Sequence, residues 1–211
     1  KKKENSTFFI FLCYNILCIG MIYYMKSMQR RRIIMLICVK NLKKKYGGKS
    51  SYAVEDITIE GHGGEIIGIL GHNGAGKSTT IKCITGMHPY EEGSISICGY
   101  DLKTDSISAK QNFGYVSDEF NLFEKMTGFE FINFLADIYN VEIADREERI
   151  NKFQKIFALG DSIYNEISSY SHGMKQKISL MGALIHNPKV FILDEPMVGL
   201  DPKQIIEIRE L

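Results

Sequence analysis

The chain has 211 residues, of which 45% are apolar and 24% charged, so it can bury a core as one large domain or as one domain with an appendage. Residues 1–34 carry seven Lys or Arg against one acid, whereas residues 35–211 carry a net charge of −5, which does not favour binding to nucleic acid. The five cysteines are odd in number and include no C-x-x-C pair, which favours reduced, buried residues of a cytosolic domain over disulfides or metal ligands.

The N-terminal extension, residues 1–34, differs in composition from the rest. Residues 8–25 are almost entirely apolar and lie between basic clusters, which fits a single membrane anchor with a cytoplasmic C-terminal side. A cleaved signal peptide is an alternative, but no small-residue cleavage site stands out. A translation start at Met35 is another alternative, in which the extension is an artefact, and we favour this interpretation.

Short strands are expected after Met35. Residues 35–39 and 52–59 are separated only by a polar turn, which predicts an antiparallel edge. Tyr46 lies in this turn and could stack on a nucleotide base, although an ordinary half-exposed turn tyrosine explains the spacing equally well. Residues 65–70 then form a short apolar run that is typical of a buried strand.

A glycine-rich turn follows that strand and matches the G-x-x-x-x-G-K-[ST] pattern at every fixed position. It consists of Gly71, His72, Asn73, Gly74, Ala75, Gly76, Lys77 and Ser78. Glycines let backbone N–H groups approach phosphates, Lys77 adds a positive charge for the β- and γ-phosphates, and Ser78 offers a hydroxyl to Mg²⁺. The helix that begins at Ser78 points its free N–H groups at the same anion. We therefore predict a nucleoside triphosphate site, the alternative being a glycine-rich turn with a chance Lys-Ser.

The chain beyond the turn is expected to form a helix over residues 79–85, strands over residues 94–98 and 113–116, and then about fifty residues of helical pattern. Two apolar stripes in this helical pattern favour packing rather than a cofactor site. They consist of Phe129, Ile132, Phe134, Leu135 and Ile138, and of Ile150, Phe153, Ile156 and Phe157.

Two carboxylates follow a last apolar strand, residues 190–193. Asp194 and Glu195 would lie at the carboxyl end of this strand, where open α/β sheets bind ligands. A buried acid needs a cation or a proton, and a nucleotide-bound Mg²⁺ would supply the cation. The alternative is a pair of acids in a polar turn. The chain stops at Leu211 inside a helical pattern, so we expect a fragment of a longer protein.

Taken together, residues 35–211 resemble the ATP-binding cassette (ABC) ATPase family, and most of all the bacterial exporters whose ATPase and permease are separate chains. The resemblance implies an α/β fold, namely a P-loop NTPase (RecA-like) core with an antiparallel β edge and an inserted α-helical subdomain at about residues 119–170.

Individual positions match the motifs of that family. The Walker A loop corresponds to residues 71–79, which adds Thr79 to the site, and Tyr46 falls at the aromatic residue that stacks on adenine. Ser171 and Gly173 keep the hydroxyl and the glycine of the signature sequence. The remaining matches are Asp194, the Walker B acid that supports Mg²⁺; Glu195, the catalytic carboxylate; and residues 199–202, the D-loop.

The chain departs from the family pattern in several places, including Tyr170, His172 and Met174 of the signature sequence. Asp118 stands where the Q-loop glutamine is expected, and as an acid it could bind metal-bound water. His72 replaces the usual proline of Walker A, and the residues offer no reason for it. The switch histidine is expected beyond Leu211, so we expect the 211-residue chain to hydrolyse ATP poorly.

The resemblance implies an ATPase that uses ATP and Mg²⁺, with Glu195 and Lys77 as catalytic residues. The implied partners are a second cassette in a homo- or heterodimer and a transmembrane permease, which would hold the chain at the cytoplasmic face of the membrane. A soluble ABC-type mechanical ATPase of translation or DNA repair remains an alternative. A P-loop kinase or GTPase would leave the signature segment, which begins at Ser171, without a role.

Overall fold

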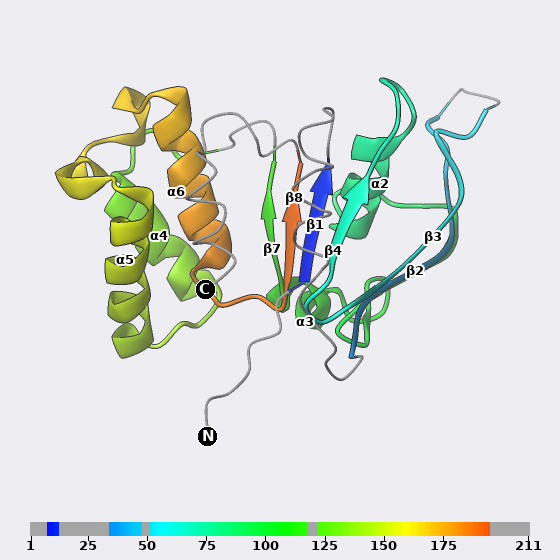
Figure 1. Cartoon of the computed structure of the whole chain (residues 1–211), viewed down its shortest axis with the longest axis horizontal. Coiled ribbons are helices and arrows are strands. Elements are labelled where there is room, and N and C mark those ends of the chain that lie inside the picture. Colours follow the sequence, from blue (N-terminus) through cyan, green and yellow to red (C-terminus); the bar gives the residue numbers. More distant parts are fainter. Residues whose placement is uncertain (1–7, 13–33, 48–50, 118–121, 195–211) are drawn as a thin grey trace. The chain divides into compact units, whose positions relative to one another are not determined.

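The structure is a computed structural model that describes residues 8–12, 34–47, 51–117 and 122–194 (Figure 1). The chain divides into two compact units. The first comprises Lys1–Tyr115 and Pro188–Glu195, and the second comprises Val116–Asn187 and Pro196–Leu211.

A parallel sheet forms one half of the first unit. Its strands are β4 (Ile66–Ile69), β1 (Phe8–Leu12), β8 (Val190–Leu193) and β7 (Phe113–Val116), in the order β4-β1-β8-β7. β1 pairs in parallel with β4 on one side and with β8 on the other. The two strands that lead into the predicted phosphate loop and into Asp194 are therefore separated by one strand.

β1 contains the first residues of the apolar run that we interpret from the sequence as a membrane anchor or, preferably, as part of an artefact upstream of Met35. In the structure, residues 8–12 instead form a strand that pairs with β4 and β8, which differs from both interpretations. The remaining residues of that run, 13–25, lie outside the described residues. Within the part of the chain that the structure describes, no helix is long and apolar enough to cross a membrane.

An antiparallel sheet forms the other half of the first unit. It contains β2 (Met35–Lys44), β3 (Val54–His62), β5 (Glu92–Ile97) and β6 (Tyr100–Asp101), in the order β3-β2-β5-β6. All three pairings are antiparallel, which confirms the predicted antiparallel edge.

The helix α2 (Lys77–Ile84) joins the two sheets through the core of the first unit. Its residues Ile81 and Ile84 are fully buried in one apolar cluster with residues of β2, β5 and β8. Burial of a side chain of this size stabilises the fold by about 1.5–3 kcal/mol. This packing fixes the position of the N-terminus of α2, which directly follows the glycine-rich turn. The other helix in the part of this unit that the structure describes is the short α3 (Ser106–Gln111).

The second unit is helical in its described part. Its elements are α4 (Gly128–Ile138), α5 (Ile143–Phe157), the 3₁₀ turns η1 (Gly160–Tyr164) and η2 (Ile167–Ser169), and α6 (His172–Leu184). α4 begins with a capping box, in which the Thr127 hydroxyl accepts from the N–H of Glu130 and the Glu130 carboxylate accepts from the N–H of Thr127.

The two predicted apolar stripes differ in outcome. In α5, Ile150, Phe153 and Phe157 are buried, as predicted. In α4 the predicted stripe is wrong in part, because Ile132 is fully buried but Phe129, Phe134 and Ile138 are exposed. Phe131 and Ala136 are buried as well, so the buried face is rotated from the predicted one. The segment has aromatic residues on both faces, so its periodicity could not identify the buried one.

Candidate nucleotide site

The glycine-rich turn between β4 and α2 depends on glycine at two positions. Gly74 and Gly76 have φ of +83° and +85°, in the left-handed region that favours glycine. A Cβ at Gly76 would also lie 2.3 Å from the carbonyl oxygen of Ala53, which excludes any other residue without a backbone shift. Gly76, a fixed position of the pattern, is therefore required by the backbone geometry of this turn.

Lys77 is folded back over the turn. Its side chain is buried, and its Nζ donates to the carbonyl oxygens of Gly71 at 2.7 Å and of His72 at 2.9 Å. Hydrogen bonds from a charged donor are about twice as strong as neutral ones. The ammonium is thus held inside the loop, where its charge can meet phosphate oxygens.

His72 occupies the position of the usual Walker A proline. Its Nδ1 lies 2.8 Å from the carbonyl oxygen of Asn73. Because a carbonyl oxygen only accepts, Nδ1 carries the proton and donates. A side-chain hydrogen bond therefore restrains the loop at the position where a proline ring would do so.

The first turn of α2 is open to an anion. No side chain caps the helix at Gly76, and its first turn contains no acid. The positive end of the helix dipole and the first backbone N–H groups can therefore interact with a phosphate.

The donors predicted for Mg²⁺ fit a hard cation. Ser78 brings a half-buried hydroxyl to the first turn of α2, and Asp194 follows β8 with its side chain 1% exposed. A buried carboxylate is stable where a cation or hydrogen-bond donors compensate its charge. Mg²⁺ is usually held by one or two protein oxygens together with water and substrate phosphates. Among the described residues, no group of three or more His, Cys, Asp or Glu side chains is arranged to hold a metal ion.

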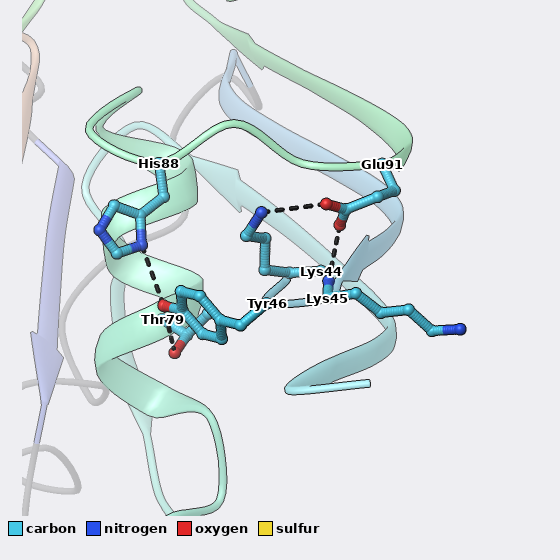
Figure 2. Close-up of polar contacts among 6 residues, drawn as sticks. All are labelled: Lys44, Lys45, Tyr46, Thr79, His88 and Glu91. Atoms are coloured by element: carbon cyan, nitrogen blue, oxygen red, sulfur yellow. Dashed lines mark hydrogen bonds and ion pairs between the residues drawn. The ribbon is translucent and has the colours of Figure 1, made fainter. Parts of the chain in front are cut away.

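Tyr46 is anchored close to the same helix (Figure 2). Its hydroxyl lies 2.9 Å from Nδ1 of His88 and 3.3 Å from Oγ1 of Thr79, in the first turn of α2. The structure thus places the predicted base-stacking residue beside the predicted phosphate loop. The sequence alone assigns neither His88 nor Glu91 a role in the site, because no spacing rule links either residue to Tyr46.

Ser171 and Gly173 belong to the second unit, at the start of α6. Ser171 is the N-cap residue, and its Oγ accepts from the N–H of Met174 at 3.3 Å. The Ser171 side chain is exposed. The signature segment therefore presents a helix N-terminus, a second place where backbone N–H groups can receive an anion.

The residue before the signature serine is structural. Tyr170 is buried and donates from its hydroxyl to the carbonyl oxygen of Ser162 at 2.7 Å. Burial raises the pKa of this phenol. A Cβ at Gly128 would lie 2.4 Å from the same hydroxyl, so glycine at that position makes room for it.

Three of the predicted features lie outside the described residues. They are Asp118, Glu195 and the D-loop at residues 199–202. Their assignments remain predictions from the sequence.

Comparison with known proteins identifies the family. Residues 54–198, more than half of the chain, match the family model described as ABC transporter. The chain belongs to the ABC transporter family. The matched residues of this ABC cassette include the phosphate loop, the signature segment and Asp194.

Relatives and solved structures of ABC cassettes agree with this assignment. The linearmycin resistance ATP-binding protein LnrL of Bacillus subtilis is 35% identical over 83% of this chain and 56% of its own length. The methionine import ATP-binding protein MetN of Clostridium acetobutylicum is 32% identical over 83% of this chain and 56% of its own. The chain thus spans just over half the length of these relatives.

Two solved structures share the fold and more than a quarter of the aligned residues. The ATP-binding subunit of an ABC transporter is 34% identical, with a TM-score of 0.77 over 83% of this chain and 73% of that one. A dimeric post-hydrolysis state of the cassette MJ0796, bound to ADP and Pi, is 26% identical. Its TM-score is 0.70 over 82% of this chain and 79% of that one.

Proposed function

We propose that the chain is the ATP-binding and ATP-hydrolysing part of an ABC transporter that moves its substrate, in the export direction, through a separate permease. The observation that carries the proposal is the buried ammonium of Lys77 inside a loop whose Gly76 is required by its backbone. The names of the relatives include both a resistance protein and an importer, and we favour export because of the likeness to the former.

The residues divide the work of hydrolysis between binding and chemistry. Lys77 and the N–H groups of the loop bind the phosphates and offset the charge that develops during phosphoryl transfer. Mg²⁺, bound near Ser78 and Asp194, would supply further charge compensation. Glu195 orients or deprotonates the attacking water, as a carboxylate directly after the last strand can.

A second cassette would complete the site. Ser171 and Gly173 of one copy would close over ATP held by the loop of the other, so that the γ-phosphate links the two copies. The exposed N-terminus of α6 supports this proposal, because it offers backbone N–H groups to an anion. The dimeric MJ0796 structures give the arrangement a precedent.

A permease would bind the helical second unit and hold the cassette at the cytoplasmic face of the membrane. This unit exposes large apolar side chains, including Phe123 at 53%, Phe134 at 38% and Ile138 at 55%. The rings of Phe123 and Phe134 contact each other edge to face, with their centroids 5.4 Å apart, so they form one apolar surface. Exposed apolar side chains that adjoin one another are typical of protein-binding surfaces.

ATP binding and turnover of three variants test the proposal. Lys77→Ala should weaken ATP binding by about tenfold or more, because a charged contact is lost. Lys82→Ala removes the same charge from the last turn of α2 and should bind ATP normally. Glu195→Gln should bind ATP, lose turnover and accumulate as an ATP-bound dimer.

Two results would contradict the assignments. Equal ATP affinity of the Lys77 and Lys82 variants would refute the role of Lys77 in phosphate binding. Turnover of Glu195→Gln at the parental rate would refute the role of Glu195 as the base. For transport itself, the protein should co-purify with a multi-span membrane protein. Association with ribosomes or DNA instead would favour the soluble mechanical ATPase.

A further inference from the structure

The hydroxyl of Tyr46 lies between two elements of the first unit. His88 approaches it from the segment after α2, with Nδ1 at 2.9 Å, and Thr79 approaches it from the first turn of α2, with Oγ1 at 3.3 Å (Figure 2). The rings of His88 and Tyr46 are perpendicular, at 87° with centroids 5.7 Å apart. The edge of the tyrosine ring is therefore fixed at a defined place beside the phosphate loop.

This network can form with either neutral tautomer of His88. If Nδ1 accepts, the Tyr46 phenol donates to His88 and Thr79 donates to the phenol oxygen. If Nδ1 carries a proton, His88 donates to the phenol oxygen and the phenol donates to Thr79. In both arrangements the phenol joins the histidine to the helix that receives the phosphates.

The backbone that leads into Tyr46 is fixed by Glu91. One carboxylate oxygen accepts from the N–H of Lys45 at 2.6 Å, and the other pairs with Nζ of Lys44 at 3.0 Å. These contacts, first of all the bond from Lys45, lower the pKa of Glu91. Nζ of Lys44 also lies over the Tyr46 ring, 5.4 Å from its centroid. One face of the ring thus meets a cation, and a base would stack on the other.

We propose that His88 is a positioning residue for nucleotide recognition, which orients the Tyr46 ring for the base and ties it to Thr79. This inference rests on the proposed stacking of adenine on Tyr46. Because Thr79 directly follows Ser78, the network links the contact with the base to the contact with the phosphates. Loss of His88 should weaken the recognition of the base, because Tyr46 is its hydrogen-bond partner, and should leave phosphate binding by Lys77 and the loop N–H groups intact.

The test compares His88→Leu with His88→Asn in the 211-residue chain. The asparagine side chain places a hydrogen-bonding atom where Nδ1 lies, whereas leucine places a methyl group there. Each variant is titrated by calorimetry with ATP and with inorganic tripolyphosphate, which has no base. Tyr46→Phe keeps the ring without its hydroxyl, and Tyr46→Leu removes the ring.

His88→Leu should lose about 3- to 10-fold in ATP affinity, the usual worth of one hydrogen bond, and should bind tripolyphosphate as the parent does. His88→Asn should keep ATP affinity to within about twofold. In the Tyr46→Phe background, His88→Leu should have no further effect, because the phenol that it positions is gone.

Other results overturn the inference and separate it from the proposed function. If Tyr46→Leu weakens ATP binding selectively while His88→Leu does not, stacking stands and the positioning role fails. An equal loss for ATP and tripolyphosphate in His88→Leu means that the histidine supports only the loop, which also refutes the inference. If Tyr46→Leu leaves both affinities unchanged, the proposed stacking itself is wrong.

Discussion

Gly74→Ala should destabilise the protein less than Gly76→Ala, because the surroundings of the two loop glycines differ. Gly74 and Gly76 have nearly the same positive φ, and a side chain in this conformation costs about 1–2 kcal/mol. The lower entropy of an unfolded chain with alanine offsets about 0.4–1 kcal/mol of this cost. No atom lies within 4 Å of a Cβ at Gly74. Gly74→Ala should therefore reduce the free energy of unfolding by no more than about 1.5 kcal/mol.

Gly76→Ala adds a collision to the same conformational cost. Its Cβ would lie 2.3 Å from the carbonyl oxygen of Ala53 and 3.3 Å from Cγ2 of Val54. The oxygen belongs to the backbone and cannot rotate away, and the N–H of Ala53 is held by the carbonyl of Lys44 at 2.8 Å. Overpacking against such neighbours costs about 1–3 kcal/mol, so the total loss should be about 3 kcal/mol.

Urea unfolding followed by circular dichroism measures both losses of stability. ATP titration of the folded variants measures how well the loop still binds ATP. Gly76→Ala should also lose more ATP affinity than Gly74→Ala, because the end of α2 must shift to relieve the collision. Equal destabilisation by the two substitutions would refute the argument, since it would mean that the contact with Ala53 does not constrain the loop.

Three further predictions concern packing and protonation. Gly128→Ala should destabilise the second unit, because the new methyl group meets the hydroxyl of Tyr170. Adding Tyr170→Phe removes that oxygen and should restore part of the lost stability. Strictly additive losses of the two substitutions in urea unfolding would contradict this prediction. The lowered pKa of Glu91 implies stability that is present above the ordinary carboxyl pKa and lost as pH falls through the lowered value. The melting temperature of Glu91→Gln should therefore fall less on acidification than that of the parent, and parallel falls would exclude the contribution. Burial raises the pKa of Cys83 to about 11, so iodoacetamide should modify it only after denaturation, and peptide mapping that finds it modified in the native protein would refute its burial.

The phosphate loop could be predicted from the sequence because its chemistry is local. The fixed spacing of glycines, Lys77 and Ser78 describes one turn and the first turn of one helix, and the structure has that turn between β4 and α2. The antiparallel edge could also be predicted, because the expected strands 35–39 and 52–59 are too close in the sequence for a crossover helix between them.

Contacts between distant segments could not be predicted in this way. Tyr46 and His88 lie on different elements, and only the pairing of β2 with β5 and the position of α2 bring them together. The exposed face of α4 was also missed, because a segment with aromatic residues on both sides has no single apolar period. The positions of Asp118 and Glu195 remain predictions.

The central place of β1 has a consequence for how the protein folds during synthesis. β1 is the first described strand to leave the ribosome, and one of its edges can pair with β4 early. Its other edge must wait for β8, the last described strand, whereas the helices of the second unit form from one continuous segment in between. Contacts across such a separation form slowly, and unpaired strand edges promote aggregation in the meantime. We therefore expect nascent chains that end before residue 190 to depend on chaperones, and this dependence to fall once β8 can pair.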